Sequence, residues 1–490
     1  MNHRLISRIL GRVLLLLGGA QLLCLMFVLL DPTADDRTGQ ALAFLASAFV
    51  SAWGAGLMSW HGRASTGLIL RKEAIAVVGL GWMVCTSFGA IPFMLCEPRL
   101  GIADSLFESV SGFTTTGATV MSNLESVPRG LMLWRCLTQW LGGMGILVLF
   151  VALLTSFRIG SKAIFRHESS AKGASGMSSP MSTVAMRLWQ IYIALSAICF
   201  VGLKLLGMSW FDAACHTFTV LSTGGFGTHD TSIAHFDSLA IELWLILFMI
   251  LGSISFMLYA LLLQKKWKRG WQDEETKWFL AIVGLVTLAV ALDLFFLNQE
   301  LTLGHGLRVA LFQVVAIVST TGFTTSDFNL WPPLSGVLLL LLMMIGGCAG
   351  STAGGVKLSR WVLFFKMTRQ QLLAAFRPNQ VTTLKLNGSQ VVDSLRVDTV
   401  FFIALAGVTV LVGTVVVSVL EPDLDMASSV SSVLATLFNI GPGLGAVGPT
   451  HNFAGLTPVT KIFLSVLMIM GRLEFSAVLV LFMPSLWRKY

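Results

Sequence analysis

The chain has 490 residues, of which 55% are hydrophobic and only 12% are charged. Soluble domains carry about 25% charged residues, so this composition excludes an ordinary soluble globular protein. The formal net charge is +8, but the basic residues lie in connections between apolar runs and not on one face of a soluble fold, which excludes a nucleic-acid partner.

Two apolar stretches come first, at 9–30 and 42–60. Each is about 20 residues long, the length that crosses the hydrocarbon core of a bilayer. The first follows a basic N-terminus, but it is too long for the apolar region of a cleaved signal peptide and no A-x-A-like motif follows it. We therefore expect residues 1–70 to form two retained transmembrane helices.

A unit then recurs four times: a long apolar helix, a short apolar segment, a polar loop with a glycine, and a second long helix. These repeats predict an all-α polytopic membrane protein, with two leading helices and four pore units. The expected units are 71–158, 159–265, 266–376 and 377–490. Their second long helices are expected at 131–155, 239–263, 335–365 and 458–485.

The short segments decide how often the chain crosses the membrane. They comprise 103–113, 211–221, 306–319 and 426–438, and each is too short to span a bilayer. Lys and Arg gather in alternate connections, which by the positive-inside rule puts both termini in the cytoplasm; an extra crossing at each short segment would break this alternation. We expect each segment to enter as a half-helix and return as extended chain around one aqueous pore.

A polar motif with a glycine follows each half-helix. The four motifs are Thr115-Thr116-Gly117, Ser222-Thr223-Gly224, Thr320-Thr321-Gly322 and Asn439-Ile440-Gly441. Glycine reaches backbone conformations closed to other residues, so successive carbonyl oxygens can point inward and replace the water around a potassium ion. One such motif also suits an ordinary turn, but four in register predict a potassium-binding filter. The fourth motif lacks both hydroxyl groups, so we expect an asymmetric ring.

Half of the residues from 346 to 355 are glycine. Each glycine weakens a helix by about 1 kcal/mol relative to alanine, so we expect the helix at 335–365 to open here into a loop below the filter. Close helix packing is the simpler alternative, and a nucleotide-binding loop is disfavoured because no strand precedes it. The candidate gate residues are Gly346, Gly347, Gly350, Ser351, Thr352, Gly354 and Gly355.

Charged residues interrupt the last apolar segment. Arg472 lies well inside it, where an ionised group is costly and normally faces a partner or water. One interpretation pairs Arg472 with a carboxylate such as that of Glu474. The other places Arg472 beside the 346–355 loop, where its charge repels a cation below the filter. Lys461 is expected to extend its ammonium group to the interface.

No catalytic or metal-binding constellation accompanies these features. The seven cysteines show neither metal-ligand spacing nor a paired pattern. A membrane-embedded enzyme would need acidic or histidine clusters at one interface, so we expect no enzyme and no covalently bound cofactor. A cation-coupled secondary transporter with alternating access is the alternative to a channel-like potassium subunit.

The loop sequences resemble those of the TrkH family, the membrane subunits of bacterial Trk potassium uptake systems in the Trk/Ktr/HKT superfamily. The matching stretches are 112–119, 221–226, 320–325 and 439–445. The resemblance covers essentially the whole chain, including the two leading helices. In this superfamily a glycine at all four filter positions accompanies potassium selectivity, whereas a serine at the first position favours sodium.

The resemblance also implies an assembly: a homodimer in the inner membrane with one pore per chain, and a cytosolic, nucleotide-binding regulatory subunit of the TrkA type. It further implies that the 346–355 loop is the gate and that Arg472 lies beside it. The basic linkers 156–187 and 264–277 are candidate docking surfaces. Charge that faces solvent or lipid head groups is the ordinary explanation of both linkers.

Overall fold

The computed structural model describes residues 1–32, 36–63, 71–157, 181–265, 270, 272–297, 302–377, 379 and 383–484. These residues are predominantly helical, with a short antiparallel hairpin of β1 (Lys385–Leu386) and β2 (Ser389–Gln390). Six described helices are long and apolar enough to cross a membrane, and one bent helix pair adds a seventh span if it is counted together. The expected all-α polytopic fold is confirmed.

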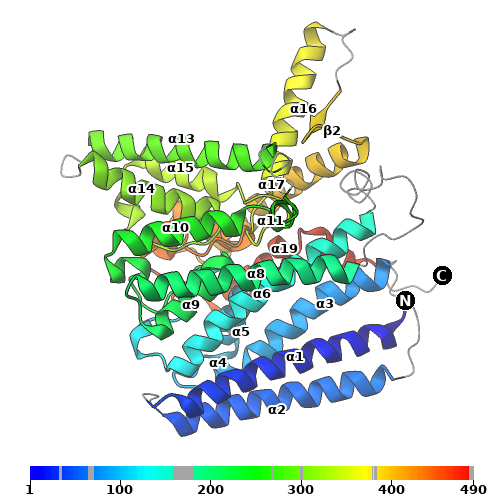
Figure 1. Ribbon diagram of the computed structural model, residues 1–490, viewed down its shortest axis with the longest axis vertical. Coiled ribbons are helices and arrows are strands. Elements are labelled where there is room, and N and C mark those ends of the chain that lie inside the picture. Colours follow the sequence, from blue (N-terminus) through cyan, green and yellow to red (C-terminus); the bar gives the residue numbers. More distant parts are fainter. Residues whose placement is uncertain are drawn as a thin grey trace.

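The two leading helices are α1 (His3–Leu30) and α2 (Arg37–His61), which run side by side along one edge of the bundle (Figure 1). Small residues allow their close approach: a Cβ added to Gly11 would lie 2.9 Å from the carbonyl oxygen of Ala55. Close packing through small residues is typical of membrane helices. Both helices pack on the first pore unit, which follows them in the chain.

Four units follow, each with a long helix, a short helix and a second long or broken helix. The first comprises α3 (Arg71–Gly89), α4 (Ile91–Leu95), α5 (Ile102–Phe113) and α6 (Arg129–Phe157). The second comprises α8 (Met181–Leu205), α9 (Trp210–Leu221), α10 (Leu239–Ser253) and α11 (Phe256–Leu263). The third comprises α13 (Glu274–Leu297), α14 (Leu303–Val318), α15 (Pro333–Met343) and α16 (Leu358–Phe376). The fourth comprises α17 (Asp393–Leu420), α18 (Met426–Leu437), α19 (Pro458–Arg472) and α20 (Ser476–Leu479).

The short helices α5, α9, α14 and α18 are the half-helices expected from the sequence. They have 12, 12, 16 and 12 residues, so at a rise of 1.5 Å per residue they are about 18–24 Å long. That length is less than the roughly 30 Å of a bilayer's hydrocarbon core. Their C-terminal halves are buried by the surrounding long helices, so all four end inside the protein.

Three of the second long helices are broken, whereas the sequence predicted a break in one. The third unit opens between Met343 and Leu358, as expected. The predicted straight helix at 239–263 is wrong, because α10 and α11 meet at an angle of 91°. The predicted helix at 458–485 is also wrong, because α19 ends at Arg472 and the chain turns through left-handed residues at Glu474 and Phe475.

Tertiary contacts explain the break after α10. The carbonyl oxygen of Ser253 accepts a hydrogen bond from the Cys348 N–H at 2.9 Å, and that of Gly252 accepts one from the Thr352 N–H at 3.2 Å. These carbonyls therefore bond to the glycine-rich segment of the third unit instead of continuing the helix. The local sequence carries no proline at this point, so the break was not visible without its partner segment.

Candidate functional site

All four short helices end in the same turn. The second residue after each helix has a left-handed backbone, with φ between 54° and 57°; these residues are Thr115, Thr223, Thr320 and Asn439. The N–H of the following residue donates back to a carbonyl five residues earlier, at 2.8–2.9 Å; the donors are Thr116, Gly224, Thr321 and Ile440. The turn therefore directs its N–H groups into the helix, as in a Schellman-type C-cap.

A glycine with positive φ comes next in each loop. The four are Gly117 (φ 84°), Gly225 (φ 76°), Gly322 (φ 77°) and Gly441 (φ 103°). Residues with side chains rarely adopt this conformation, which explains the choice of glycine. Within the described residues, no hydrogen-bond donor bonds to the carbonyl oxygens of these four glycines.

The left-handed glycines join the loops into a closed ring. A Cβ added to Gly117 would lie 2.1 Å from the carbonyl oxygen of Gly224 in the second loop. One added to Gly225 would lie 1.7 Å from that of Thr321 in the third loop, and one added to Gly322 would lie 2.0 Å from that of Ile440 in the fourth. The fourth loop returns to the first, because a Cβ on Gly441 would lie 2.9 Å from the carbonyl oxygen of Thr116.

This ring corrects the register of the second loop. The sequence aligned Gly224 with Gly117, whereas the backbone aligns Gly225 with Gly117, and Gly224 takes the position of Thr116. The reason is that α9 ends at Leu221, so Ser222 is its C-cap and Thr223 is the left-handed residue. Two adjacent glycines permit either register, and only the end of the helix distinguishes them.

A cavity of about 320 Å³, here named the vestibule, opens on the ring. All four left-handed glycines line it, together with polar and titratable groups such as Asp230, His229 and His451. The sequence predicts that the four loops lie together, and in the structure all four contribute a glycine to the wall of the vestibule.

Buried side chains fix the loops from behind. Gln139 on α6 donates to the carbonyl oxygen of Gly224 at 2.8 Å and accepts from the N–H of Phe226 at 3.1 Å. Arg135, one turn earlier, forms a buried ion pair with Glu108 at 2.6 Å. The sequence interpretation missed all three residues. The available signal was an arginine and a glutamine four positions apart inside an apolar helix.

The fourth loop also bonds directly to the first. Asn439 Nδ2 donates to Thr116 Oγ1 at 2.8 Å and to the carbonyl oxygen of Met468 on α19 at 3.0 Å. Asparagine thus takes the place of a hydroxyl residue in the fourth motif without leaving Thr116 unsatisfied. The asymmetry that the sequence predicts for the fourth motif therefore takes the form of a hydrogen bond between the fourth loop and the first.

The glycine-rich segment between α15 and α16, residues 344–357, lies against the other side of the loops; we name it the inner loop. Thr352 Oγ1 donates to the carbonyl oxygen of Leu221, the last residue of α9, at 2.8 Å. The Gly354 N–H donates to Thr320 Oγ1 at 2.6 Å. A Cβ on Gly354 would lie 2.5 Å from the carbonyl oxygen of Phe438. The inner loop therefore contacts three of the four corners of the ring.

Left-handed glycines shape the inner loop. Gly350 has φ 76° and Gly355 has φ 69°. A Cβ on Gly346 would lie 2.1 Å from the carbonyl oxygen of Gly354, so the two ends of the loop touch. Small residues here allow close packing, as the simpler interpretation held, but they form a loop and not a helix interface.

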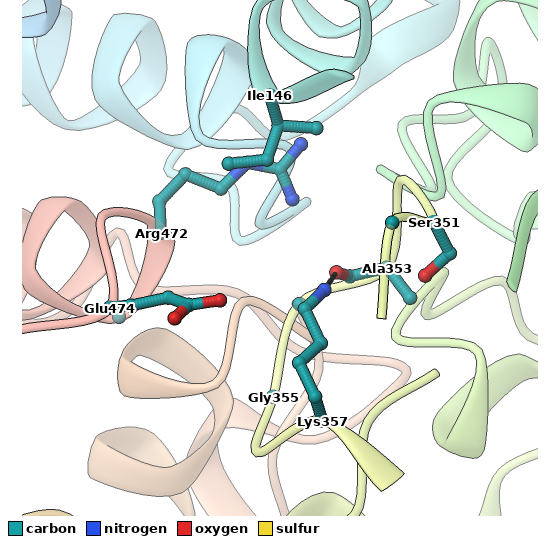
Figure 2. A pocket seen from close by; sticks show the side chains of 10 residues that line it. Ile146, Ser351, Ala353, Gly355, Lys357, Arg472 and Glu474 are labelled. Carbon is teal, nitrogen blue, oxygen red and sulfur yellow. Dashed lines mark hydrogen bonds between the residues drawn. The ribbon is translucent and has the colours of Figure 1, made fainter. Parts of the chain in front are cut away.

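Arg472, the last residue of α19, is 3% exposed. Its Nη1 donates to the carbonyl oxygen of Thr352 at 2.8 Å, while Nε and Nη2 have no hydrogen-bond partner among the described residues. Glu474 is not the partner of Arg472, because its carboxylate pairs with Arg360 at 2.5 Å. In Figure 2 the guanidinium of Arg472 is turned toward Ile146, and Glu474 points elsewhere.

A second, smaller cavity of about 30 Å³ lies between Arg472 and the inner loop (Figure 2). Lys357, which lines it, donates to the carbonyl oxygen of Ala353 at 2.5 Å. Two basic side chains therefore border the narrow space below the ring. All the candidate gate residues except Gly346, Gly347 and Thr352 line this cavity.

The interpretation of Lys461 was wrong. Its side chain is 6% exposed and pairs with Asp104, near the start of α5, at 2.6 Å. It also donates to the carbonyl oxygen of Ala454 at 2.9 Å. An acidic partner at the start of the first short helix holds this lysine within the protein instead of letting it reach the interface.

Comparisons with known proteins agree with this architecture. The family model TrkH, described as cation transport protein, matches residues 43–489. The Trk system potassium uptake protein TrkH of Salmonella typhimurium is 37% identical over the full length of both chains, and that of Escherichia coli is 36% identical, also over the full length. The crystal structure of the potassium transporter TrkH from Vibrio parahaemolyticus superposes with a TM-score of 0.89 at 34% identity, covering 100% of both chains.

These relatives are transport proteins, which confirms that the chain is not an enzyme. The match spans both leading helices and all four units, so it applies to the whole architecture and not to a fragment. The chain belongs to the TrkH family of cation transport proteins.

Proposed function

We propose that the chain conducts potassium ions across the bacterial inner membrane as the channel-like subunit of a Trk-type uptake system. The observation that carries the proposal is the closed ring, in which each left-handed glycine abuts a carbonyl oxygen of the next loop. The relatives from Salmonella typhimurium and Escherichia coli are potassium uptake proteins by name. Potassium is therefore the favoured cargo.

The chemistry of the loops suits a dehydrated cation. Their first N–H groups bond back into the short helices, so the loops present oxygens rather than donors to the centre of the ring. Rings of backbone carbonyls replace the hydration shell of potassium without burying a full counter-charge. The C-terminal ends of the short helices, which carry partial negative charge, favour a cation at the same place.

The filter is assigned to the four loops in the corrected register. Its residues are Thr115, Thr116, Gly117, Ser222, Thr223, Gly224, Gly225, Thr320, Thr321, Gly322, Asn439, Ile440 and Gly441. Glycine holds the second positive-φ position in all four loops, at Gly117, Gly225, Gly322 and Gly441, and by the resemblance to the TrkH family this favours potassium over sodium. Potassium is here the transported ion and not a resident cofactor.

The inner loop and Arg472 are assigned as the gate. The loop bonds to the underside of the ring at Thr320 and Leu221, so it occupies the route that an ion takes after leaving the filter. Arg472 adds a buried positive charge with two unpartnered nitrogen atoms at that level. A cation that pauses there meets electrostatic repulsion until the loop and Arg472 move.

The wider assembly remains part of the proposal: a homodimer with one pore per chain, both termini in the cytoplasm, and a TrkA-type nucleotide-binding ring as regulator. Much of the linker 156–187 and part of the linker 264–277, proposed as docking surfaces, lie outside the described residues. The support for a partner is the name of the relative from Salmonella typhimurium, which assigns that protein to a Trk system.

Flux through the purified protein in proteoliposomes tests this function. We expect potassium and rubidium to pass faster than sodium, and Gly117→Ser to reduce that preference, because the new side chain would meet the carbonyl oxygen of Gly224. A channel-like subunit predicts a rate that rises with the ion gradient over a wide range. Cation-coupled alternating access, the alternative, predicts saturation and dependence on a coupling ion. Unchanged selectivity in Gly117→Ser contradicts the filter assignment.

A further inference from the structure

The helix α6 of the first unit presents two buried polar side chains, Arg135 and Gln139, to the second loop. They are four residues apart and therefore lie on the same face of the helix. Arg135 is 1% exposed and Gln139 is fully buried. With Glu108 on α5, which is also fully buried, they form a connected set that we name the polar brace.

Gln139 fixes the backbone on both sides of the left-handed Gly225. Its Nε2 donates to the carbonyl oxygen of Gly224 at 2.8 Å, and its Oε1 accepts from the N–H of Phe226 at 3.1 Å. A carboxamide can donate and accept in one plane, which an ionised carboxylate or an apolar side chain of this size cannot do. The carboxamide thus sets the orientation of two peptide groups in the ring.

Arg135 joins the second loop to the first. Its Nη1 donates to the carbonyl oxygen of Gly227 at 3.0 Å, and its guanidinium lies 3.6 Å from the centre of the Phe226 ring. Its Nε pairs with Glu108 at 2.6 Å. Glu108 in turn accepts from Thr119 Oγ1 at 2.9 Å and from the Val120 N–H at 3.1 Å, just beyond the first filter motif.

Removal of three polar side chains from water is costly, and replacing a buried ion pair by apolar residues is often neutral or stabilising. Stability alone therefore does not account for the brace. The brace instead fixes the positions of the first and second loops relative to each other. The third loop has a weaker counterpart, a single bond of 3.5 Å from Gln313 to the carbonyl oxygen of Phe323.

We propose that the polar brace determines ion selectivity, with Gln139 as the main positioning residue. This inference rests on the proposed function of the loops as a potassium filter. A filter held at the size of potassium disfavours the smaller sodium ion, because its oxygens do not close onto that ion. Without the brace, the oxygens of the second loop can move closer to the smaller sodium ion, and the ratio of potassium to sodium flux falls.

The test is the ratio of potassium to sodium flux in proteoliposomes made with the full-length protein. Gln139→Leu removes both bonds and keeps the approximate volume, and we expect the ratio to fall about tenfold, the effect of one to two net hydrogen bonds. A residue with only a structural role would instead lower the amount of folded protein and leave the ratio unchanged.

Gln21→Leu is the matched control. Gln21 on α1 is also a fully buried glutamine with two bonds, donating to the Phe88 carbonyl oxygen at 3.3 Å and accepting from Ser51 Oγ at 2.9 Å. It lies outside the four loops, so Gln21→Leu should keep the wild-type ratio. If Gln139→Leu keeps it as well, the inference is wrong.

Arg135→Lys covers the case in which Gln139→Leu does not fold. Lysine preserves the charge opposite Glu108 but has no planar fork to reach both Glu108 and the Gly227 carbonyl, so we expect a several-fold fall in the ratio, and an unchanged ratio overturns the inference. Wild-type protein without potassium flux would instead overturn the proposed function. A wild-type preference that Gly117→Ser abolishes but the brace variants leave intact contradicts the brace alone.

Discussion

The Nη1 of Arg472 donates to the carbonyl oxygen of Thr352 at 2.8 Å, which ties the end of α19 to the inner loop of the third unit. The other two nitrogen atoms of the guanidinium have no partner among the described residues. A buried ionised group is costly to retain, and this cost supports the proposed role of Arg472 in the gate. Packing alone does not require a charge there.

Arg472→Ala should raise potassium flux by roughly an order of magnitude or more. A positive charge close to the path opposes a cation by roughly 2 kcal/mol at an effective dielectric constant of about 20, and alanine removes this repulsion together with a bond to the inner loop. The measurement is flux in proteoliposomes, normalised to inserted protein. Arg99→Ala is the control, because Arg99 forms an exposed pair with Glu97. Equal or lower flux in Arg472→Ala argues against the barrier role.

Thr352→Val should loosen the inner loop. Valine keeps the shape of threonine but removes the hydroxyl that donates to the carbonyl oxygens of Leu221 and Gly252 at 2.8 and 3.0 Å. The lost bond is worth about 1 kcal/mol, so basal potassium flux should rise about fivefold. In the control Thr399→Val, the lost bond runs only to the preceding turn of α17. If both variants behave alike, contact between inner loop and ring does not limit flux.

Gly225→Ala should abolish selective potassium flux, whereas Gly227→Ala should be tolerated. Gly225 has φ 76° and an added Cβ would lie 1.7 Å from a backbone carbonyl oxygen. At Gly227, two residues later, the nearest atom is 3.5 Å away, which is ordinary contact. Flux assays on both variants, after size-exclusion chromatography to verify folding, compare them directly. Normal selectivity in Gly225→Ala would show that the register of the second loop is wrong.

Lys461→Met should lower thermal stability more than the double change with Asp104→Asn. The pair lies at 2.6 Å with the lysine largely buried and the aspartate side chain one-third exposed, so removing one partner leaves an uncompensated charge that costs about 2 kcal/mol. Melting temperatures in detergent, arranged as a double-mutant cycle, measure the coupling. Additive losses would mean that the two residues do not interact.

The sequence predicted the repeated unit because its signal is local: apolar length, a short segment, then a glycine motif. It also predicted the opening between Met343 and Leu358, where the glycines themselves weaken the helix. The bends after Ser253 and Arg472 escaped prediction because they depend on partners distant in sequence. Cys348 supplies the donor in one case, and in the other the chain turns beside the Arg360–Glu474 pair.

The candidate site was predicted in part for the same reason. Thr115, Thr320 and Asn439 could be aligned from their motifs, whereas the second loop has two adjacent glycines and therefore no unique alignment. Gln139 and Arg135 carry no motif, and their role depends on α6 of one unit facing the loop of the next. Contacts between units are not visible in a pattern that repeats within units.

The bond from Asn439 to Thr116 joins residues 323 positions apart, and it lies where the ring closes. During synthesis the chain leaves the ribosome from its N-terminus, so the first corner is made long before the corner that completes it. The first and third loops lack their contacts with the fourth loop until the last quarter of the chain is inserted. A chain that ends before residue 439 has only three of the four corners, so the ring closes only when synthesis is nearly finished.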